Sequence, residues 1–414
     1  MRSNSIQRVI VIAILALVLV IGLLMLNSQL VKFQPTEKNF LVPWLGMRTY
    51  LEFGDDPYGL PATQRAQVLY YGNLAKEKQD PLYLSLPYFT EILFFPIGLV
   101  GNYAIARVVW LLLLESCLVG SALVSLSYFD WKANRPLKVL YFLVSVIGTQ
   151  AVMPLINHSI VIIAFFLFWI GLLCLKRGLD EFSGAALTVA LFLKISIWLL
   201  LLFVVWWVVR NRRWRVIWGM LMAGGFLIAL SILLYPGWFF PYLKALRNEL
   251  DYFQTISTYS TLTIIWPAIG SKVAGLLTVV VLAFLANEWR LMKPERPRWF
   301  LWGISLTIIA MPILGTPILR EDLLFLWFPF SFLLFNLDEI IGRRKVSFVT
   351  GVILSLVLVS AWFLSLGTRL KLIGSTDVII KLIMPSFILA VWLYWIRWRN
   401  LKSPKNILEM DSLE

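Results

Sequence analysis

The sequence predicts an all-α polytopic membrane protein, and three observations support this fold class. Of its 414 residues, 60% are hydrophobic and only 14% are charged, whereas soluble domains carry about 25% charged residues. Apolar runs of about 20 residues, the length of a membrane-spanning helix, recur along the chain. The alternating segments of about ten residues that form a transmembrane barrel do not occur in the sequence. Helices remain, because the hydrocarbon core excludes unpaired backbone groups.

Hydropathy predicts about 11–13 membrane-embedded helices, some of which do not span fully. The first apolar segment is too long for a signal-peptide core and lacks a small-residue cleavage site, so we expect it to be retained. The expected segments are residues 9–30, 86–101, 103–129, 138–156, 158–175, 182–193, 195–209, 216–235, 266–288, 299–315, 323–337, 346–366 and 378–396. Together they predict one integral membrane domain over residues 1–414.

The charges sort the connectors into two kinds. Segment 31–85 has six basic and six acidic residues, and segment 236–265 has two of each. The positive-inside rule predicts these two connectors to be extracytoplasmic, both termini to be cytoplasmic, and residues 397–414 to form a cytoplasmic tail of a plasma-membrane protein. The orientation of residues 86–129 stays open. The strongly basic connectors are Arg210–Arg215, Arg290–Arg298, Arg343–Lys345 and Arg397–Lys405.

The formal net charge of +14 does not indicate nucleic acid, because the basic residues lie beside helix ends. There they orient the chain and contact anionic lipid, so the bilayer is the expected partner. Cys117 and Cys174 lie inside apolar runs, which argues against a disulfide or a thiolate metal site. With a single histidine in the chain, we expect no metal centre and no cofactor.

The polar segment 31–85 predicts two short helices in an extracytoplasmic loop. Gly54 is a plausible end of the first, after which residues 55–57 begin a turn. The second runs over about residues 62–71 and is bounded by Pro61 and Gly72. A helix with one aromatic-rich face next to a membrane anchor is expected to lie in the interface. The residues that share this face at helical spacing are Phe40, Trp44, Met47 and Leu51.

Segments 182–193 and 195–209 are each short for a spanning helix, and basic connectors flank both. A helical hairpin with Lys194 near its apex fits this pattern. A lysine in mid-membrane costs about 2.5–3.5 kcal/mol, so Lys194 is expected to face protein or a water-filled cavity. Arg107, Glu115 and Glu91 also lie in apolar segments, where we expect structural pairing.

A series of short motifs resembles a known family. The sequence has no glycine-rich phosphate loop, which argues against a soluble nucleotide donor and leaves a donor that sits within the bilayer. The motifs follow one another in the order Asn39-Phe40, Trp44, Gly46, Arg48, Gly54 to Tyr58, Gln67, Tyr71-Gly72, Pro87, Ala106 to Trp110, Lys176 to Gly178, Ser183-Gly184 and Lys194. This order resembles glycosyltransferase family 87, the polyprenol-phosphate-mannose-dependent mannosyltransferases of the GT-C fold, over most of residues 1–215.

The resemblance implies inverting transfer of a hexose or pentose from a polyprenyl-phosphate donor to a cell-envelope glycan or glycolipid, at the extracytoplasmic face of a GT-C-like bundle. In that family an aspartate after the first helix takes the proton of the acceptor hydroxyl. The matching position here is Asn39, and an amide cannot act as a base. Two further departures are His158, where the family often has glutamine, and Ile195 after Lys194, where it often has proline. The site is therefore either rewired to another carboxylate or catalytically degenerate.

The candidate residues each have a structural alternative. Candidates for the catalytic step are Asp55, Asp56 and Glu37, together with Asn39; the two aspartates also suit a turn, and Glu37 also suits a solvated loop. Candidates for the donor phosphate and substrate are Lys194, His158, Arg320, Arg48 and Tyr58. Lys194 could instead pair with an intramembrane carboxylate, His158 could cap a helix, and the charged Arg320–Asp322 loop could simply be solvated.

The alternative function is a lipid-linked-sugar flippase or transporter. In that case Lys194, Glu115 and Arg107 would be charges along a pathway. The sequence shows no pair of broken helices in an inverted repeat, and a transporter has little use for a long outer loop with interfacial helices.

Overall fold

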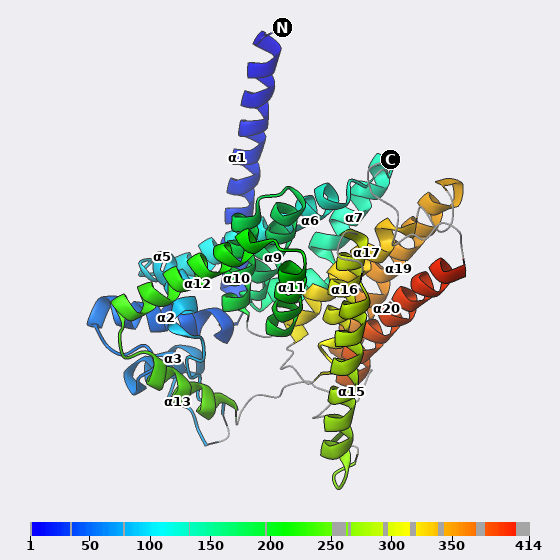
Figure 1. Ribbon diagram of the computed structural model, residues 1–414. Helices are drawn as coiled ribbons and strands as arrows, with labels where there is room; N and C mark the ends of the chain where they lie inside the picture. Colours follow the sequence, from blue (N-terminus) through cyan, green and yellow to red (C-terminus); the bar gives the residue numbers. More distant parts are fainter. Residues whose placement is uncertain are drawn as a thin grey trace. The chain divides into compact units, whose positions relative to one another are not determined.

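The computed structural model describes residues 2–33, 35–77, 79–131, 133–194, 197–250, 262–263, 266–292, 297–314, 320–337, 343–369 and 377–402. Within these ranges every regular element is a helix (Figure 1). Four stretches are long and apolar enough to cross a membrane, namely α6 (Tyr103–Phe129), Arg135–Ile156, α12 (Trp214–Leu234) and α15 (Gly270–Leu291). A bent pair, Leu17–Phe33 with Lys38–Phe53, makes a possible fifth. The all-α class and the presence of several candidate membrane spans are confirmed.

The chain divides into two compact units. Unit 1 contains Met1–Cys117, Leu155–Ile160 and Leu227–Phe253, and unit 2 contains Leu118–Pro154, Val161–Phe226 and Gln254–Glu414. The helices of unit 1 are α1 (Arg2–Phe33), α2 (Lys38–Phe53), α3 (Leu60–Tyr71), α4 (Tyr88–Glu91), η1 (Ile92–Phe94), α5 (Phe95–Gly98), the first half of α6 and α13 (Phe239–Leu250).

Helix α2 is the centre of unit 1. It ends at Gly54, whose φ of +69° is a left-handed conformation that favours glycine, as the sequence predicted. The aromatic face lies differently from our expectation. Phe40, Trp44 and Met47 are buried, and α2 packs against α4, η1 and α5. Periodicity identified the side chains that share a face, but protein covers this face.

Helix α3 confirms the second predicted helix of this segment. Pro61 lies in its first turn, where no backbone donor is needed, and Gly72 ends it with a φ of +79°. One face packs on α2 through Ala62, Thr63, Ala66 and Gln67. The Gln67 side chain also fixes the following loop, because its Nε2 donates to the Pro81 carbonyl at 2.9 Å and its Oε1 accepts from the Ala75 amide at 3.0 Å.

Unit 2 is built on a core of aromatic side chains. Trp169, Phe168, Phe328 and Trp302 are fully buried there. The predicted interruption between the two short helices is confirmed, because Lys194 is the non-helical residue after α10 and α11 begins at Trp198. The helices of unit 2 are α7 (Arg135–Ile147), most of α8 (Thr149–Ile156), α9 (Val161–Lys176), α10 (Asp180–Leu193), α11 (Trp198–Arg210), α15, α16 (Pro297–Ala310), η3 (Arg320–Leu326), α17 (Trp327–Phe335), α19 (Arg343–Arg369) and α20 (Asp377–Lys402), with the second half of α6 and the first part of α12.

Two glycines let α10 and α12 approach closely. A Cβ at Gly184 would lie 2.0 Å from the carbonyl oxygen of Val216, and one at Gly219 would lie 2.0 Å from that of Glu181. Backbone atoms cannot rotate aside, so the helices must separate. We expect Gly219→Ala to lower the free energy of unfolding by about 1–3 kcal/mol. Thermal unfolding in detergent micelles measures this.

Gly225→Ala is the matched control, because Gly225 lies on the same helix with nothing within 4 Å of its added Cβ. Alanine is the better helix former, so this variant is expected to match or slightly exceed the wild type. Equal melting temperatures for Gly219→Ala and Gly225→Ala would show that the close crossing is wrong.

Candidate functional site

A buried cation anchors the connector that follows α1 in unit 1. Arg107, in the first half of α6, is only 2% exposed. Its Nε donates to His158 Nε2 at 3.0 Å, and its Nη2 donates to the Pro35 carbonyl at 2.7 Å. The guanidinium therefore ties the connector between α1 and α2 to the segment that contains His158.

His158 is held in a single orientation between α8 and α9. Its φ of +54° is a left-handed conformation, which histidine adopts more readily than most residues. The indole of Trp110 donates to the His158 carbonyl at 3.0 Å. Nδ1 lies 2.8 Å from the Ile156 carbonyl, which can only accept. We therefore place the proton on Nδ1, which leaves the Nε2 lone pair for Arg107.

The His158 ring is neutral at physiological pH. Burial, and next the charge of Arg107, lower the pKa of His158 to about 4. Its remaining nitrogen already accepts from Arg107. His158 is thus suited to orienting Arg107 rather than to taking a proton from a substrate or binding a phosphate as a cation.

Glu37 and Asn39 lie at the half-buried edge of this cluster. Glu37 is the N-cap residue of α2, but its side chain makes no capping hydrogen bond. Its charge acts on Arg107, on the phenol of Tyr103 and on that of Tyr70. Asn39 donates from Nδ2 to the Asn157 carbonyl at 3.2 Å, next to His158. The structure thus brings three of the predicted site residues, Glu37, Asn39 and His158, to the surroundings of Arg107. We refer to Arg107, His158, Glu37 and Asn39 as the Arg107 cluster.

Aromatic rings line the inner side of the Arg107 cluster. Phe40 stacks on Trp110 with ring centroids 5.4 Å apart and on Tyr103 at 6.0 Å. Trp110 also stacks on Phe94 at 4.8 Å. Phe40, Trp110 and Phe94 are almost fully buried, so the inner side is dry and strengthens electrostatic interactions between the charges.

The other candidates in the polar segment all have structural partners. Asp56 accepts from the Tyr58 amide at 2.9 Å, which confirms the predicted turn. Asp55 lies 3.6 Å from Arg65, and Arg48 forms an ion pair with Glu52 at 2.9 Å. The Tyr58 hydroxyl donates to the Leu86 carbonyl at 2.7 Å. The turn matches the structural alternative for Asp56, and Glu37 lies two residues after the Pro35 carbonyl that Arg107 holds.

The charged side chains in the apolar segments of unit 1 do not pair with one another, contrary to our prediction. Arg107 is bonded to His158 and to a backbone carbonyl, whereas Glu115 accepts from Asn27 Nδ2 at 3.0 Å. Glu91, on α4, is fully buried, and only the backbone of Met47 on α2 favours its charged form. Oε1 faces α2 at Gly46, where an added Cβ would come within 3.2 Å. Burial raises the pKa of Glu91 well above 4.5.

Glu91 is expected to make stability fall as the pH rises. In the unfolded chain it ionises near pH 4.5, whereas the folded protein keeps it protonated to higher pH. Above pH 4.5 the unfolded state therefore binds fewer protons, and the free energy of unfolding drops by up to about 1.4 kcal/mol per pH unit until the folded pKa is reached. Glu91→Gln should remove this slope, as melting temperatures between pH 4.5 and 8 will test. An unchanged slope would mean that Glu91 is not the titrating group.

Unit 2 contains a separate charge pair. Lys194 Nζ lies 3.0 Å from Asp322 Oδ1, with side-chain exposures of 15% and 5%. This is the carboxylate pairing that we considered as the alternative for Lys194. The sequence placed Asp322 in a solvated loop, but Glu321 and Asp322 are buried in η3. Arg320 begins this helix, and its side chain lies outside the described residues.

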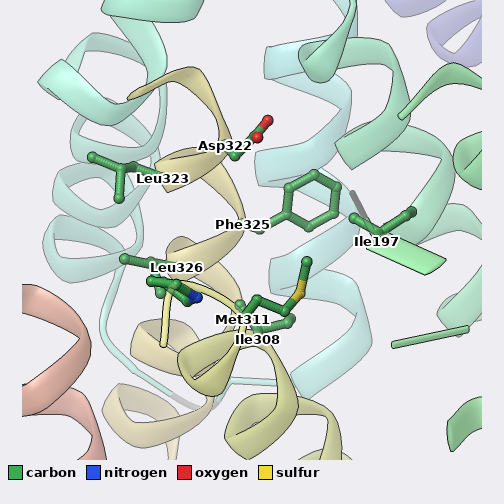
Figure 2. A pocket seen from close by; sticks show the side chains of 8 residues that line it. Ile197, Ile308, Met311, Asp322, Leu323, Phe325 and Leu326 are labelled. Atoms are coloured by element: carbon green, nitrogen blue, oxygen red, sulfur yellow. The ribbon is translucent and has the colours of Figure 1, made fainter. Parts of the chain in front are cut away.

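A small apolar cavity adjoins Asp322. Figure 2 shows the Asp322 carboxylate at one edge, with Phe325 beside Ile197 and with Met311 below. The space open to the centre of a water-sized sphere is about 20 Å³, which is room for about one water molecule. The cavity cannot hold a sugar or a lipid head group, but a water there could hydrogen-bond to the carboxylate.

No family model, curated protein or solved structure matches the chain. Among the described residues, no group of three or more histidine, cysteine, aspartate or glutamate side chains could hold a metal ion.

Proposed function

We propose that the chain is a membrane glycosyltransferase with a GT-C-like bundle. It transfers a sugar from a polyprenyl-phosphate donor to a cell-envelope glycan or glycolipid at the extracytoplasmic face of the plasma membrane. One observation carries the proposal. The connector after α1, which the resemblance marks as the position of the base, contains the half-buried Glu37, two residues after the Pro35 carbonyl that the buried Arg107 holds.

In the proposed reaction Glu37 is the general base. It has the role of the aspartate that the family carries at the position of Asn39. The acceptor oxygen attacks the anomeric carbon of the donor sugar, and its proton passes to the Glu37 carboxylate. The bond from that carbon to the phosphate oxygen breaks, and polyprenyl phosphate leaves with the electron pair. A base of this kind contributes about 10²–10⁴ in rate.

Arg107 and His158 act as positioning residues in this proposal. Arg107 holds the Pro35 carbonyl and lies within the electrostatic range of Glu37, while His158 fixes Arg107. Among the cations that the sequence suggested for the leaving phosphate, Arg48 belongs to the same compact unit. A fixed cation there would stabilise the charge that develops on the phosphate.

The transporter alternative has less support. It needs Lys194, Arg107 and Glu115 as charges along a pathway. Each of them instead forms an ion pair or a hydrogen bond with a side chain of its own unit. Paired charges suit structural roles better than a conducting path.

The test is transfer by the purified protein in proteoliposomes. Mannosyl, other hexosyl and pentosyl polyprenyl phosphates are offered with envelope lipids and glycans as acceptors. We expect the acceptor mass to rise by one sugar, with one polyprenyl phosphate released per transfer and inverted anomeric configuration. Absence of product and of released polyprenyl phosphate with every donor would refute the proposal.

A further inference from the structure

An apolar groove lies on the outer side of α2 and α3 in unit 1, apart from the Arg107 cluster. Its volume is about 580 Å³, which is within the range of pockets that bind small molecules. Five apolar side chains, one amide and one cation line it, namely Leu45, Pro61, Val68, Leu69, Leu74, Gln64 and Arg65.

Three of the apolar side chains that line this groove are about half exposed. Val68 and Leu69 are each 50% exposed and Leu74 is 53% exposed. Next to lining residues, Leu60 precedes Pro61 and is 69% exposed, and Phe53 contacts Arg65 and is 55% exposed. The opposite face of α3 packs on α2, so the exposed leucine and valine side chains of α3 are not needed for its contact with α2. A contiguous exposed patch of this kind marks a contact with lipid or with another apolar surface.

The charge at the groove indicates an amphiphile. Arg65 is 36% exposed, and its guanidinium carbon lies 3.9 Å from the ring centroid of Phe53. Its nitrogens reach Thr49 Oγ1 at 3.3 Å and Asp55 at 3.6 Å. An exposed ion pair at that distance is weak, so a phosphate could compete with Asp55 for the guanidinium. The cation Arg65 complements an anionic head group, and the apolar side chains of the groove complement a hydrocarbon tail.

We propose that this groove binds an anionic phospholipid of the surrounding bilayer, with an acyl chain along Val68, Leu69 and Leu74 and the phosphate at Arg65. The candidate membrane spans of the chain make bilayer lipid the apolar molecule at the highest local concentration. The proposal concerns lipid contact alone and does not depend on sugar transfer.

The test places a fluorescent label in the groove of the full-length protein. Val68→Cys and, as the matched control, Lys76→Cys are made in a Cys117→Ala/Cys174→Ala background and labelled with an environment-sensitive dye. Lys76 is exposed but does not line the groove. Each protein is placed in nanodiscs of phosphatidylcholine and phosphatidylglycerol, with either ordinary or brominated acyl chains.

We expect bromine to quench most of the fluorescence at position 68 and little at position 76. Native mass spectrometry should show bound phosphatidylglycerol on the wild type, and Arg65→Gln should reduce it severalfold. Equal quenching at the two positions overturns the proposal. So does a dye signal that disappears on dilution, which would indicate a second copy of the chain, or lipid binding that is unchanged in Arg65→Gln.

Discussion

Replacement of Glu37 by glutamine is expected to slow sugar transfer by about 10²–10⁴-fold, because the amide cannot accept the proton of the acceptor hydroxyl. The substitution keeps the size of the side chain, so the connector should stay in place through the bonds that Arg107 makes to Pro35 and His158. The measurement is the single-turnover rate in proteoliposomes with saturating donor. The loss should appear in this rate, whereas donor binding should change little.

Glu77→Gln provides the control for Glu37→Gln. Glu77 is an exposed glutamate of the same polar segment, and its loss should leave the rate unchanged. The alternative is that Asp56, in the turn before Tyr58, is the base. If Glu37→Gln transfers at the wild-type rate while Asp56→Asn is inactive, the base lies at the turn and the role of the Arg107 cluster is structural.

Replacement of Lys194 by methionine is expected to lower the free energy of unfolding by about 3–5 kcal/mol, because it leaves the Asp322 carboxylate buried without its cation. Asp322 is 5% exposed and Lys194 is 15% exposed, so water compensates little. Asp322→Asn should be destabilising for the same reason. The double variant Lys194→Met/Asp322→Leu should recover much of the loss, since no buried charge remains. Thermal unfolding in micelles measures all three variants.

An exposed pair in the same unit is the control for this prediction. Lys176 contacts Asp130 at 2.6 Å, but the side chains are 37% and 75% exposed. Exposed pairs contribute about 0–1 kcal/mol, so Lys176→Met should melt close to the wild type. If Lys194→Met is as stable as Lys176→Met, then the Lys194–Asp322 pair does not stabilise the fold.

Local features of the fold were predictable from the sequence. Hydropathy identified the helical membrane class, and Gly54 and Gly72 ended α2 and α3 as predicted, because a left-handed residue is a local requirement. The covering of α2 was not predictable. A helical period states which side chains share a face, but whether lipid or α5 covers that face depends on distant segments.

The candidate site was predictable only in part. The sequence singled out Glu37, Asn39 and His158, but it did not connect them, because the link is Arg107, 51 residues from His158. The free-energy cost of burying a charge does predict that each buried cation has a partner. A buried lysine or arginine needs an acceptor, so Lys194 required a carboxylate and Arg107 required carbonyl or imidazole acceptors. The spacing of residues within one helix cannot say which distant segment provides them.

The most direct test of the account is whether a carboxylate at position 39 can replace the one at position 37. Asn39 donates to the Asn157 carbonyl, so Asn39→Asp loses that bond but places an acceptor in the same cluster. The measurement is the single-turnover transfer rate of Glu37→Gln, Asn39→Asp and the double variant. The account predicts a large loss in Glu37→Gln and partial recovery when Asn39→Asp is added. Wild-type rates in all three variants would contradict a catalytic base in the connector after α1.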